Sequence, residues 1–536
     1  MSDSTTYNID EIRQMITAIR GDDINAKLHA VSNLHVIAHS LGPLRTRVEL
    51  LPYVGDSTDN SEEFWMKVAE KLAFMMEEVG GTKEVTSLLN VLRRACEFED
   101  HNVQEPAISS IISLGNKISQ DELSRQFFPF IKSLCDDMWH PMRSAASLII
   151  CSLFSQFSES DRSRLVHFFP PLASDQIPSV RRALIRSIPK LIQKNGILPI
   201  LDLLTKLMAT VSADDSQSVL IEVPILLESF GDELMEVKQS SVMKLLTSSK
   251  WQARMSLIDH INNIFPNNIP TDIIREIANS GLTDSFVGVR ASIARQIPYI
   301  YRSNCFSHDS FEQFVSTLIS DNEPSVRVCS GRSLSKLKGA PSDSMRKFIL
   351  ILLDDTDVSV KSAALEAISE TGECFALLVP HISDIIQLYG WRQRVSVVNL
   401  LPKIAHTFDT TFFDQNLKNA LISLISNESS EVRKATVKAL KSIAAHYGAT
   451  WTQNTVIPML KKLSENSDYQ IRQIAIEAMF ELSVTPNCIE SLKALCTDPV
   501  PNVRIVLARN AKQNRQNELL TILSKDTDSD VLFFTK

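Results

Sequence analysis

Hydrophobic residues recur along the chain with the three- and four-residue spacing of amphipathic helices. Residues 161–194 show the pattern as two apolar stripes separated by the polar segment SDQIPS. The first stripe consists of Leu165, Phe168, Phe169 and Leu172, and the second of Val180, Leu184, Ile188, Leu191 and Ile192. Pro178 stands where the second stripe begins, and proline is favoured at the first position of a helix. The pattern predicts a unit of helix, short turn and helix. Because one partner helix cannot cover a whole stripe, neighbouring units are expected to stack.

The turn of this unit carries a formula that returns elsewhere in the chain. DQIPSVRRAL at 175–184 is followed by DSFVGVRASI at 284–293 and DNEPSVRVCS at 321–330. Aligning all units on the shared Arg gives 15 positions, mostly 32 to 39 residues apart, of which 11 hold Arg or Lys. The residue six positions earlier is acidic or Asn in 11 of the 15 units, from Asp59 to Asp526. This register predicts an all-α fold: an α-solenoid, coiled as a right-handed superhelix, of about fifteen HEAT repeats with the last one truncated.

The recurring Asp and Arg residues have two interpretations. In the structural one, each Asp accepts backbone N–H groups at its turn, and each Arg pairs with an Asp of its own or the adjoining unit. In the functional one, the Arg residues bind an acidic partner. A feature present in nearly every unit suits the common scaffold better than a single binding site, so we favour the structural interpretation. The ladder residues expected from it include Asp175, Arg181, Asp284, Arg290, Asp321, Arg327, Asp498 and Arg504.

Composition excludes several classes of protein. The chain of 536 residues is longer than one hydrophobic core normally supports, which agrees with a repeat array. A net charge of −8 provides no basic surface for a phosphate backbone, so no nucleic-acid partner is expected. The apolar runs are too short to span a membrane, and the N-terminus lacks the apolar core of a signal peptide. Eight cysteines without a CxxC pair indicate a reducing compartment. We therefore expect a soluble protein of the cytoplasm, and also of the nucleus.

The chain offers no convincing catalytic site. It contains no phosphate-binding loop, dinucleotide fingerprint, nucleophile elbow or zincin motif. His35 and His39 are four residues apart on an expected helix, near His29, but no cysteine or carboxylate cluster accompanies them as further metal ligands. We expect a non-catalytic protein without cofactor, metal or small-molecule substrate.

Tryptophan residues occupy several of the predicted turns, where large side chains break the repeat formula. Trp139, Trp251 and Trp391 stand in such turns, and Trp65 occupies the position of the ladder Arg itself. A tryptophan in a short turn can pack back onto the stack. Several in equivalent turns are more typical of anchors for a partner, because Trp and Arg dominate binding hot spots.

Specific segments of the chain resemble a known family. The segments are LGPLRTRVELLPYVGD at 41–56, SDQIPSVRRA at 174–183, KWQARM at 250–255, GWRQRV at 390–395, TTFFDQNL at 410–417 and DPVPNVR at 498–504. They are similar to inter-repeat and turn segments of the protein phosphatase 2A scaffold subunit family (the 65 kDa A-type regulatory subunits), whose members are fifteen-repeat HEAT proteins. The resemblance extends from Ile9 to the C-terminus without large gaps.

The resemblance implies a scaffold with two binding parts on one continuous solenoid. Repeats 1–10, residues 9–386, would hold a variable regulatory B-type subunit through their turns. Repeats 11–15, residues 387–536, would hold the phosphatase catalytic subunit. By position, the candidates for binding the catalytic subunit are Trp391, Arg392, Tyr469, Pro499, Val500 and Asn502. The candidates for binding the regulatory subunit are Trp139, Pro178, Ser179, Arg182 and Trp251. Because Arg181 fills the ladder position, the resemblance favours Arg182 as the arginine free to pair with a partner carboxylate.

Three departures from the family pattern affect this transfer. Gln252 replaces the family's Arg after the tryptophan, which removes one charged contact with the regulatory subunit. Leu220 replaces the ladder Arg of repeat six, which is expected to interrupt the ladder and to make a hinge. The chain ends at VLFFTK, where the family continues for a further helix, so Phe533 and Phe534 are expected to be exposed or covered by the partner.

Two other classes of function remain open from the sequence. A HEAT-repeat adaptor of another class, such as a nuclear-transport receptor, shares the architecture, but the long acidic insertion typical of those proteins is absent from this sequence. A solenoid enzyme would need a polar cluster outside the repeat formula, for which the three histidines are the one candidate.

Overall fold

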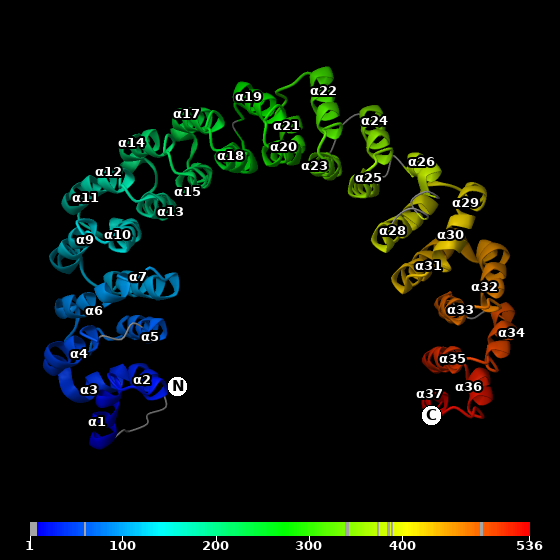
Figure 1. Ribbon diagram of the computed structural model, residues 1–536, viewed down its shortest axis with the longest axis horizontal. Coiled ribbons are helices and arrows are strands. Elements are labelled where there is room, and N and C mark those ends of the chain that lie inside the picture. Colours follow the sequence, from blue (N-terminus) through cyan, green and yellow to red (C-terminus); the bar gives the residue numbers. More distant parts are fainter. Residues whose placement is uncertain are drawn as a thin grey trace. The chain divides into compact units, whose positions relative to one another are not determined.

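The structure, a computed structural model, describes residues 8–57, 61–267, 269–337, 342–371, 375–382, 386, 390–482 and 486–535. Two predictions fall outside these ranges: the acidic turn residue Asp59 and the start of the second binding part at residue 387. Within them every regular element is a helix. The chain forms two compact units, residues 1–273 and 274–536, and each is a stack of helix pairs (Figure 1).

In the first unit, one layer is made of the helices that begin each repeat. They are α1 (Ile9–Ala18), the part of α3 (Leu34–Arg45) after Gly42 with α4 (Leu51–Gly55), α6 (Thr86–Cys96), α8 (Gln120–Glu122) with α9 (Phe128–Cys135), α11 (Glu159–Leu165) with α12 (Phe169–Ala173), α14 (Leu201–Val211) and α17 (Met235–Leu246). The helices that end each repeat make the other layer. They are α2 (Ile24–Ser32) with the part of α3 before Gly42, α5 (Glu62–Leu72), α7 (His101–Gly115), α10 (His140–Leu153), α13 (Pro178–Asn195), α15 (Gln217–Leu220) with α16 (Val223–Glu228), and α18 (Trp251–Ile264).

The second unit repeats this two-layer arrangement. Its first helices are α19 (Thr271–Leu282), α22 (His308–Ile319), α24 (Ser342–Leu353), α26 (Phe375–Leu378), α29 (Thr410–Asn416) with α30 (Lys418–Ile425), α32 (Ile457–Ser464), α34 (Pro486–Leu495) and α36 (Asn517–Leu523). Its second helices are α20 (Val287–Arg295) with α21 (Ile297–Arg302), α23 (Pro324–Leu334), α25 (Val358–Thr371), α28 (Trp391–Thr407), α31 (Ser430–Trp451), α33 (Tyr469–Glu481), α35 (Pro501–Gln513) and α37 (Ser529–Thr535). Each of the fifteen aligned positions lies in a helix of the second layer, so the predicted α-solenoid of helix pairs is confirmed.

The apolar stripes form the core between the layers and between neighbouring repeats. In the repeat that served as the example, Leu165, Phe169, Val180 and Leu184 are fully buried. Helix α10 packs on α13, and α20 on α23, so each second helix covers the stripe of the next. Helix α13 begins at Pro178 as predicted, because the fixed backbone angle of proline suits the first turn and no N–H is lost there.

Two glycines redirect the chain where one repeat passes into the next. Gly42 and Gly448 have φ angles of 77° and 85°, a region that L side chains rarely adopt. They produce sharp bends within α3 and α31, so the chain leaves the second layer and starts the next first helix without a long loop.

The recurring Arg residues join each turn to the turn of the next repeat. Arg181 donates from Nε and Nη2 to the carboxylate of Asp214, 33 residues further on, at 2.6 and 2.7 Å. Its Nη1 donates to the carbonyl of Asp175 in its own turn at 2.7 Å. The same arrangement joins the pairs Arg143–Asp175, Arg290–Asp321, Arg327–Asp355, Arg472–Asp498 and Arg504–Asp526. The side-chain partner thus belongs to the adjoining repeat, while the backbone partner belongs to the same repeat.

The ladder Asp residues also organise the turns that they occupy. Oδ1 of Asp321 accepts the N–H of Glu323 at 2.9 Å while the whole carboxylate faces Arg290. Burial alone would raise the pKa of Asp321, but the hydrogen bonds from Arg290 and the Glu323 amide, with the charges of Arg290 and Arg327, lower it below its usual value. The folded state therefore favours the ionised carboxylate.

The Arg–Asp pair is missing where another residue replaces the recurring Arg or Asp. Leu220 is buried at 3% exposure and carries no charge, so it cannot continue the ladder from Asp214 as an arginine would. In the second unit Asn466 replaces Asp, and Arg433 donates instead to the side-chain oxygen of Gln470 at 3.1 Å. Whether Leu220 makes a hinge stays a prediction.

We expect Asp321→Asn to lower the free energy of unfolding by about 2 kcal/mol at pH 7, because it leaves a largely buried guanidinium without its counter-charge. The side chains of Asp321 and Arg290 are 11% and 16% exposed. The lowered pKa of Asp321 stabilises the fold above about pH 4, where an unfolded Asp is ionised, and this contribution is lost as the pH falls through the folded-state pKa. Urea denaturation followed by circular dichroism at pH 7 and pH 3 should show a difference between variant and wild type that shrinks at pH 3.

The matched control is Asp343→Asn, which removes the same charge from a side chain that is 97% exposed. This variant should stay within about 0.5 kcal/mol of wild type. An equal loss in both variants, or an Asp321→Asn effect that does not change with pH, would contradict the role of the pair.

Candidate protein-binding sites

The turn of the fourth repeat presents Trp139 at the surface of the first unit. Asp137 accepts the Trp139 N–H at 2.8 Å, and the indole Nε1 donates to the carbonyl of Glu97 in the preceding turn at 2.7 Å. The indole nevertheless stays 46% exposed. A pocket of about 430 Å³ opens beside it, lined also by Phe98 and Met142. Trp139 therefore packs back onto the stack along one edge while leaving a face available to a partner.

The next turn lies directly beside Trp139. Pro178 is half-buried at the start of α13, and Ser179 is exposed with its Oγ 3.5 Å from Nδ1 of His140. Ile177, two residues after the ladder Asp, is 37% exposed. The Arg143–Asp175 pair holds the two turns together, so the side chains of both turns form one continuous surface.

Trp251 lies in a later turn of the same unit. It is half-buried as the first residue of α18, and Gln252 beside it is half-buried too. The structure does not bring Trp251 into the surface formed by Trp139 and Ser179.

The structure corrects the expectation that Arg182 is free. Arg182 donates from Nε to Oε1 of Glu222 at 2.9 Å, and Arg186 lies 2.8 Å from the same oxygen. The Glu222 side chain is 6% exposed. Glu222 stands 40 residues along the chain, so the spacing within one repeat could not reveal it. A guanidinium already held by a buried carboxylate has fewer donors left for a partner.

The second unit presents Trp391 at the start of α28. The ring is 43% exposed, and the guanidinium of Arg392 lies over it at 4.6 Å from the ring centroid. Arg392 is itself exposed. This cation–π contact orients an aromatic and a charged group together toward solvent, which is the combination that dominates protein-binding hot spots.

Two adjacent turns of the second unit bring the remaining candidates together. Tyr469 is 37% exposed, and Pro499 and Asn502 are exposed one turn further along the stack. Asp498 accepts the N–H of Val500 at 2.9 Å and pairs with Arg472. Burial would raise the pKa of Asp498, but these hydrogen bonds and the nearby arginine charges lower it. The ladder thus fixes the turn that displays Pro499, Val500 and Asn502.

One tryptophan packs into the core instead of being displayed to a partner. Trp65 is fully buried and packs between Phe64 and Phe98, with ring centroids 5.5 and 6.1 Å away. It fills the ladder position with apolar packing in place of a charge pair.

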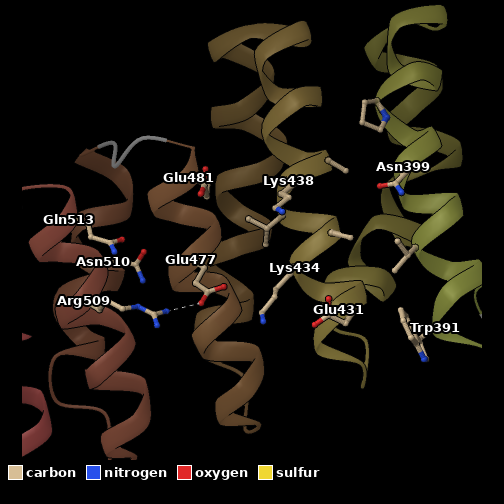
Figure 2. Close-up of a pocket in the computed structure, with 15 residues that line it drawn as sticks. Trp391, Asn399, Glu431, Lys434, Lys438, Glu477, Glu481, Arg509, Asn510 and Gln513 are labelled. Atoms are coloured by element: carbon tan, nitrogen blue, oxygen red, sulfur yellow. Dashed lines mark hydrogen bonds and ion pairs between the residues drawn. The ribbon is translucent and has the colours of Figure 1, made fainter. Parts of the chain in front are cut away.

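Several exposed residues escaped the sequence analysis. Met138, between Asp137 and Trp139, is 98% exposed. Its position in a predicted turn was the sequence signal from which its exposure could have been predicted. A groove of about 790 Å³ also runs across α28, α31, α33 and α35 (Figure 2). Its lysines and glutamates have the sequence pattern of ordinary solvated helix faces, so the sequence gives no signal that they line a groove.

The described residues hold no group of three His, Cys, Asp or Glu side chains that could bind a metal ion, the three N-terminal histidines included. The seven cysteines that the structure describes are free thiols, and burial raises the pKa of the Cys96 thiol to about 12. Among the described helices, none has the length and apolar character that crossing a bilayer requires.

Comparison with characterised proteins identifies relatives of the chain. Over 179 residues it is 30% identical to the alpha isoform of the 65 kDa regulatory subunit of serine/threonine-protein phosphatase 2A from Arabidopsis thaliana, covering 33% of this chain and 30% of that protein. Over 270 residues it is 27% identical to the A-type regulatory subunit of protein phosphatase PP2A from Saccharomyces cerevisiae, covering 47% and 42%. The chain is a homologue of these regulatory subunits. A protein phosphatase 2A scaffold subunit of Dictyostelium discoideum is 29% identical over 187 residues, covering 34% and 32%.

The resemblance to the family of 65 kDa A-type regulatory subunits is therefore confirmed, although the matched segments span less than half the length of these relatives. Their names are those of regulatory and scaffold subunits, which agrees with a non-catalytic chain. No family model matches the chain.

Solved structures of HEAT-repeat solenoids share the fold. The Kap95:Nup1 complex superimposes with a TM-score of 0.58 over 99% of this chain and 77% of that chain, at 11% identity. Kap121p gives a TM-score of 0.50 over 96% and 54%, also at 11% identity. At this identity the similarity supports the architecture and says nothing of partners.

The Arg182–Glu222 contact predicts a stability effect. We expect Glu222→Gln to lower the free energy of unfolding by about 1 kcal/mol, because two guanidinium groups then share a neutral oxygen. Thermal and urea denaturation of the full chain would measure it. Glu236→Gln, at an exposed position on α17, should leave stability unchanged. A Glu222→Gln variant as stable as wild type would show that Arg182 and Arg186 gain nothing from the carboxylate.

Proposed function

We propose that this chain is the non-catalytic scaffold of a serine/threonine protein phosphatase 2A holoenzyme. It holds the catalytic subunit on the turns of residues 387–536 and a variable B-type regulatory subunit on the turns of residues 9–386. Its proposed location is the cytoplasm, and also the nucleus. The relatives named as regulatory and scaffold subunits support the family role, and the displayed turn residues support the mode of binding.

The observation that carries this proposal is the display of aromatic residues by equivalent turns of the repeat. Trp139, Trp391 and Tyr469 are 46%, 43% and 37% exposed, and Asp137 and Asp468 accept backbone N–H groups in the turns of Trp139 and Tyr469. Rigid exposed aromatic side chains bury a large area on binding at a low entropy cost. A tandem array of them suits one long protein partner per part of the chain.

In the proposed mechanism, the scaffold raises the effective concentration of its two partners for each other. A scaffold that binds both a catalytic and a regulatory subunit makes their encounter intramolecular, which raises the local concentration of substrate and of the regulatory subunit near the active site. No group on the scaffold takes part in phosphate-ester hydrolysis in this mechanism. The catalytic subunit supplies that chemistry.

We expect Trp391→Ala to weaken binding of the purified chain to a protein phosphatase 2A catalytic subunit by about 2 kcal/mol, roughly thirtyfold in Kd, because it removes a hot-spot aromatic. Isothermal titration calorimetry would measure the loss. The control is Ile522→Ala, which shortens a side chain that is 38% exposed on the first-layer helix α36 and should not alter Kd.

The outcomes separate the role from the site. If wild type and Trp391→Ala bind equally, the scaffold role stands and the assignment of Trp391 is wrong. If neither binds, the chain is a HEAT adaptor of another class, and capture of a small GTPase from a cell extract would point to a nuclear-transport receptor.

Trp139→Ala gives the corresponding test for the other part. It should weaken binding of a B-type regulatory subunit by a similar factor while leaving the affinity for the catalytic subunit unchanged, because Trp139 lies in a turn of the first unit. Pull-down of both subunits by the same variant would show the separation. Equal loss of both would contradict a division of labour along the chain.

A further inference from the structure

The groove on the second layer of the second unit shares Trp391 with the turns discussed above and otherwise lies on helix faces. It crosses the exposed faces of α28, α31, α33 and α35, with Trp391 at the end nearest the turns (Figure 2). Its volume is about 790 Å³, large enough for a segment of polypeptide. All of its lining belongs to residues 391–513, within one compact unit.

The charges that line the groove are unevenly paired. Glu477 pairs with Arg509 at 3.3 Å, and Glu481 pairs with Lys441 at 2.7 Å. Lys434 and Lys438, one turn apart and exposed on α31, form no ion pair with any carboxylate of the described residues.

Figure 2 shows both lysines on the helix between Trp391 and the Glu477–Arg509 pair. Glu431, one turn before Lys434, is the one lining carboxylate without an ion pair among the described residues. The available charge in the groove is therefore two cations against one anion.

The rest of the lining supplies apolar and amide contacts. Trp391, Val395 and Pro402 form an apolar strip along α28. Asn399 and Gln513 are exposed at opposite sides of the groove and carry side-chain amides, which can both donate to and accept from a peptide backbone. An apolar strip, free amides and unpaired lysines together match an extended polypeptide better than a small ligand.

We propose that this groove binds an extended acidic segment of a partner protein. Carboxylates of the segment pair with Lys434 and Lys438, and an apolar side chain packs against Trp391 and Val395. Neighbouring helices pack about 8–10 Å apart, so crossing from α28 to α35 takes about 27 Å, which about eight extended residues span. The inference does not rest on the proposed phosphatase scaffold, because both lysines lie on a helix face outside the turns.

The test is selection of a random nine-residue peptide library by the full-length chain. Wild type should enrich peptides that contain two or more Asp or Glu residues and a large apolar residue, at least fivefold over the input library. The variant Lys434→Glu/Lys438→Glu should lose this enrichment, because the carboxylates would then meet like charges. Binding of a selected peptide should also weaken as salt is raised.

The matched control is Lys461→Glu/Lys462→Glu on the first-layer helix α32, which makes the same change of charge away from the groove. It should select the same peptides as wild type, and thermal melts of both variants should match wild type. No acidic enrichment by wild type, enrichment that survives the groove variant, or loss in both variants would overturn the proposal. Binding of polyuridine RNA that depends on the two lysines, without acidic enrichment, would overturn it in favour of a nucleic acid.

Discussion

The contact on which the displayed surfaces depend is the pair between an Arg of one repeat and an Asp of the next turn. The guanidinium uses Nε and Nη2 on the neighbouring carboxylate and Nη1 on a carbonyl of its own turn, so one side chain ties two turns together. The same carboxylate accepts the N–H two residues further on, which shapes the turn from within. Hydrophobic stacking of the helix layers is not directional, but this bidentate geometry is, and it fixes the register in which the turns follow each other.

That register explains how short turns can serve as binding sites. Trp139 and Val500 both stand two residues after a ladder Asp, with their N–H groups bound by its carboxylate. The turn backbone is thereby held in place while Trp139 stays 46% exposed and Val500 half-buried. Where the recurring Arg or Asp is replaced, other contacts join neighbouring repeats. Glu222, near Leu220, binds Arg182 and Arg186, and the Gln470 side chain accepts a hydrogen bond from Arg433. The stack keeps its order while its surface chemistry changes.

The second unit contains two kinds of surface. The turns display single rigid aromatic residues over a long edge, which suits folded proteins that touch many repeats. The groove between Trp391 and Gln513 concentrates unpaired lysines, amides and an apolar strip in one place, which suits a short extended segment. In one scaffold, the turns would hold the regulatory subunit with the enzyme, while the groove would hold a flexible tail.

The sequence by itself determined the helix pairs, their number, the ladder positions and the family, because helical periodicity and a repeated turn formula are local signals that survive in every copy. Pro178 at the start of a helix and the exposed faces of Trp139 and Trp391 agreed with that local pattern. The tertiary structure decided the contacts between residues that are far apart in the chain. It paired the Arg181 guanidinium with a carboxylate of the next repeat, paired Arg182 with Glu222, and buried Trp65 between phenylalanines. It also assembled the groove from four helices between residues 391 and 513, since only the packing of helix faces against each other determines which side chains share a surface and which charges remain unpaired.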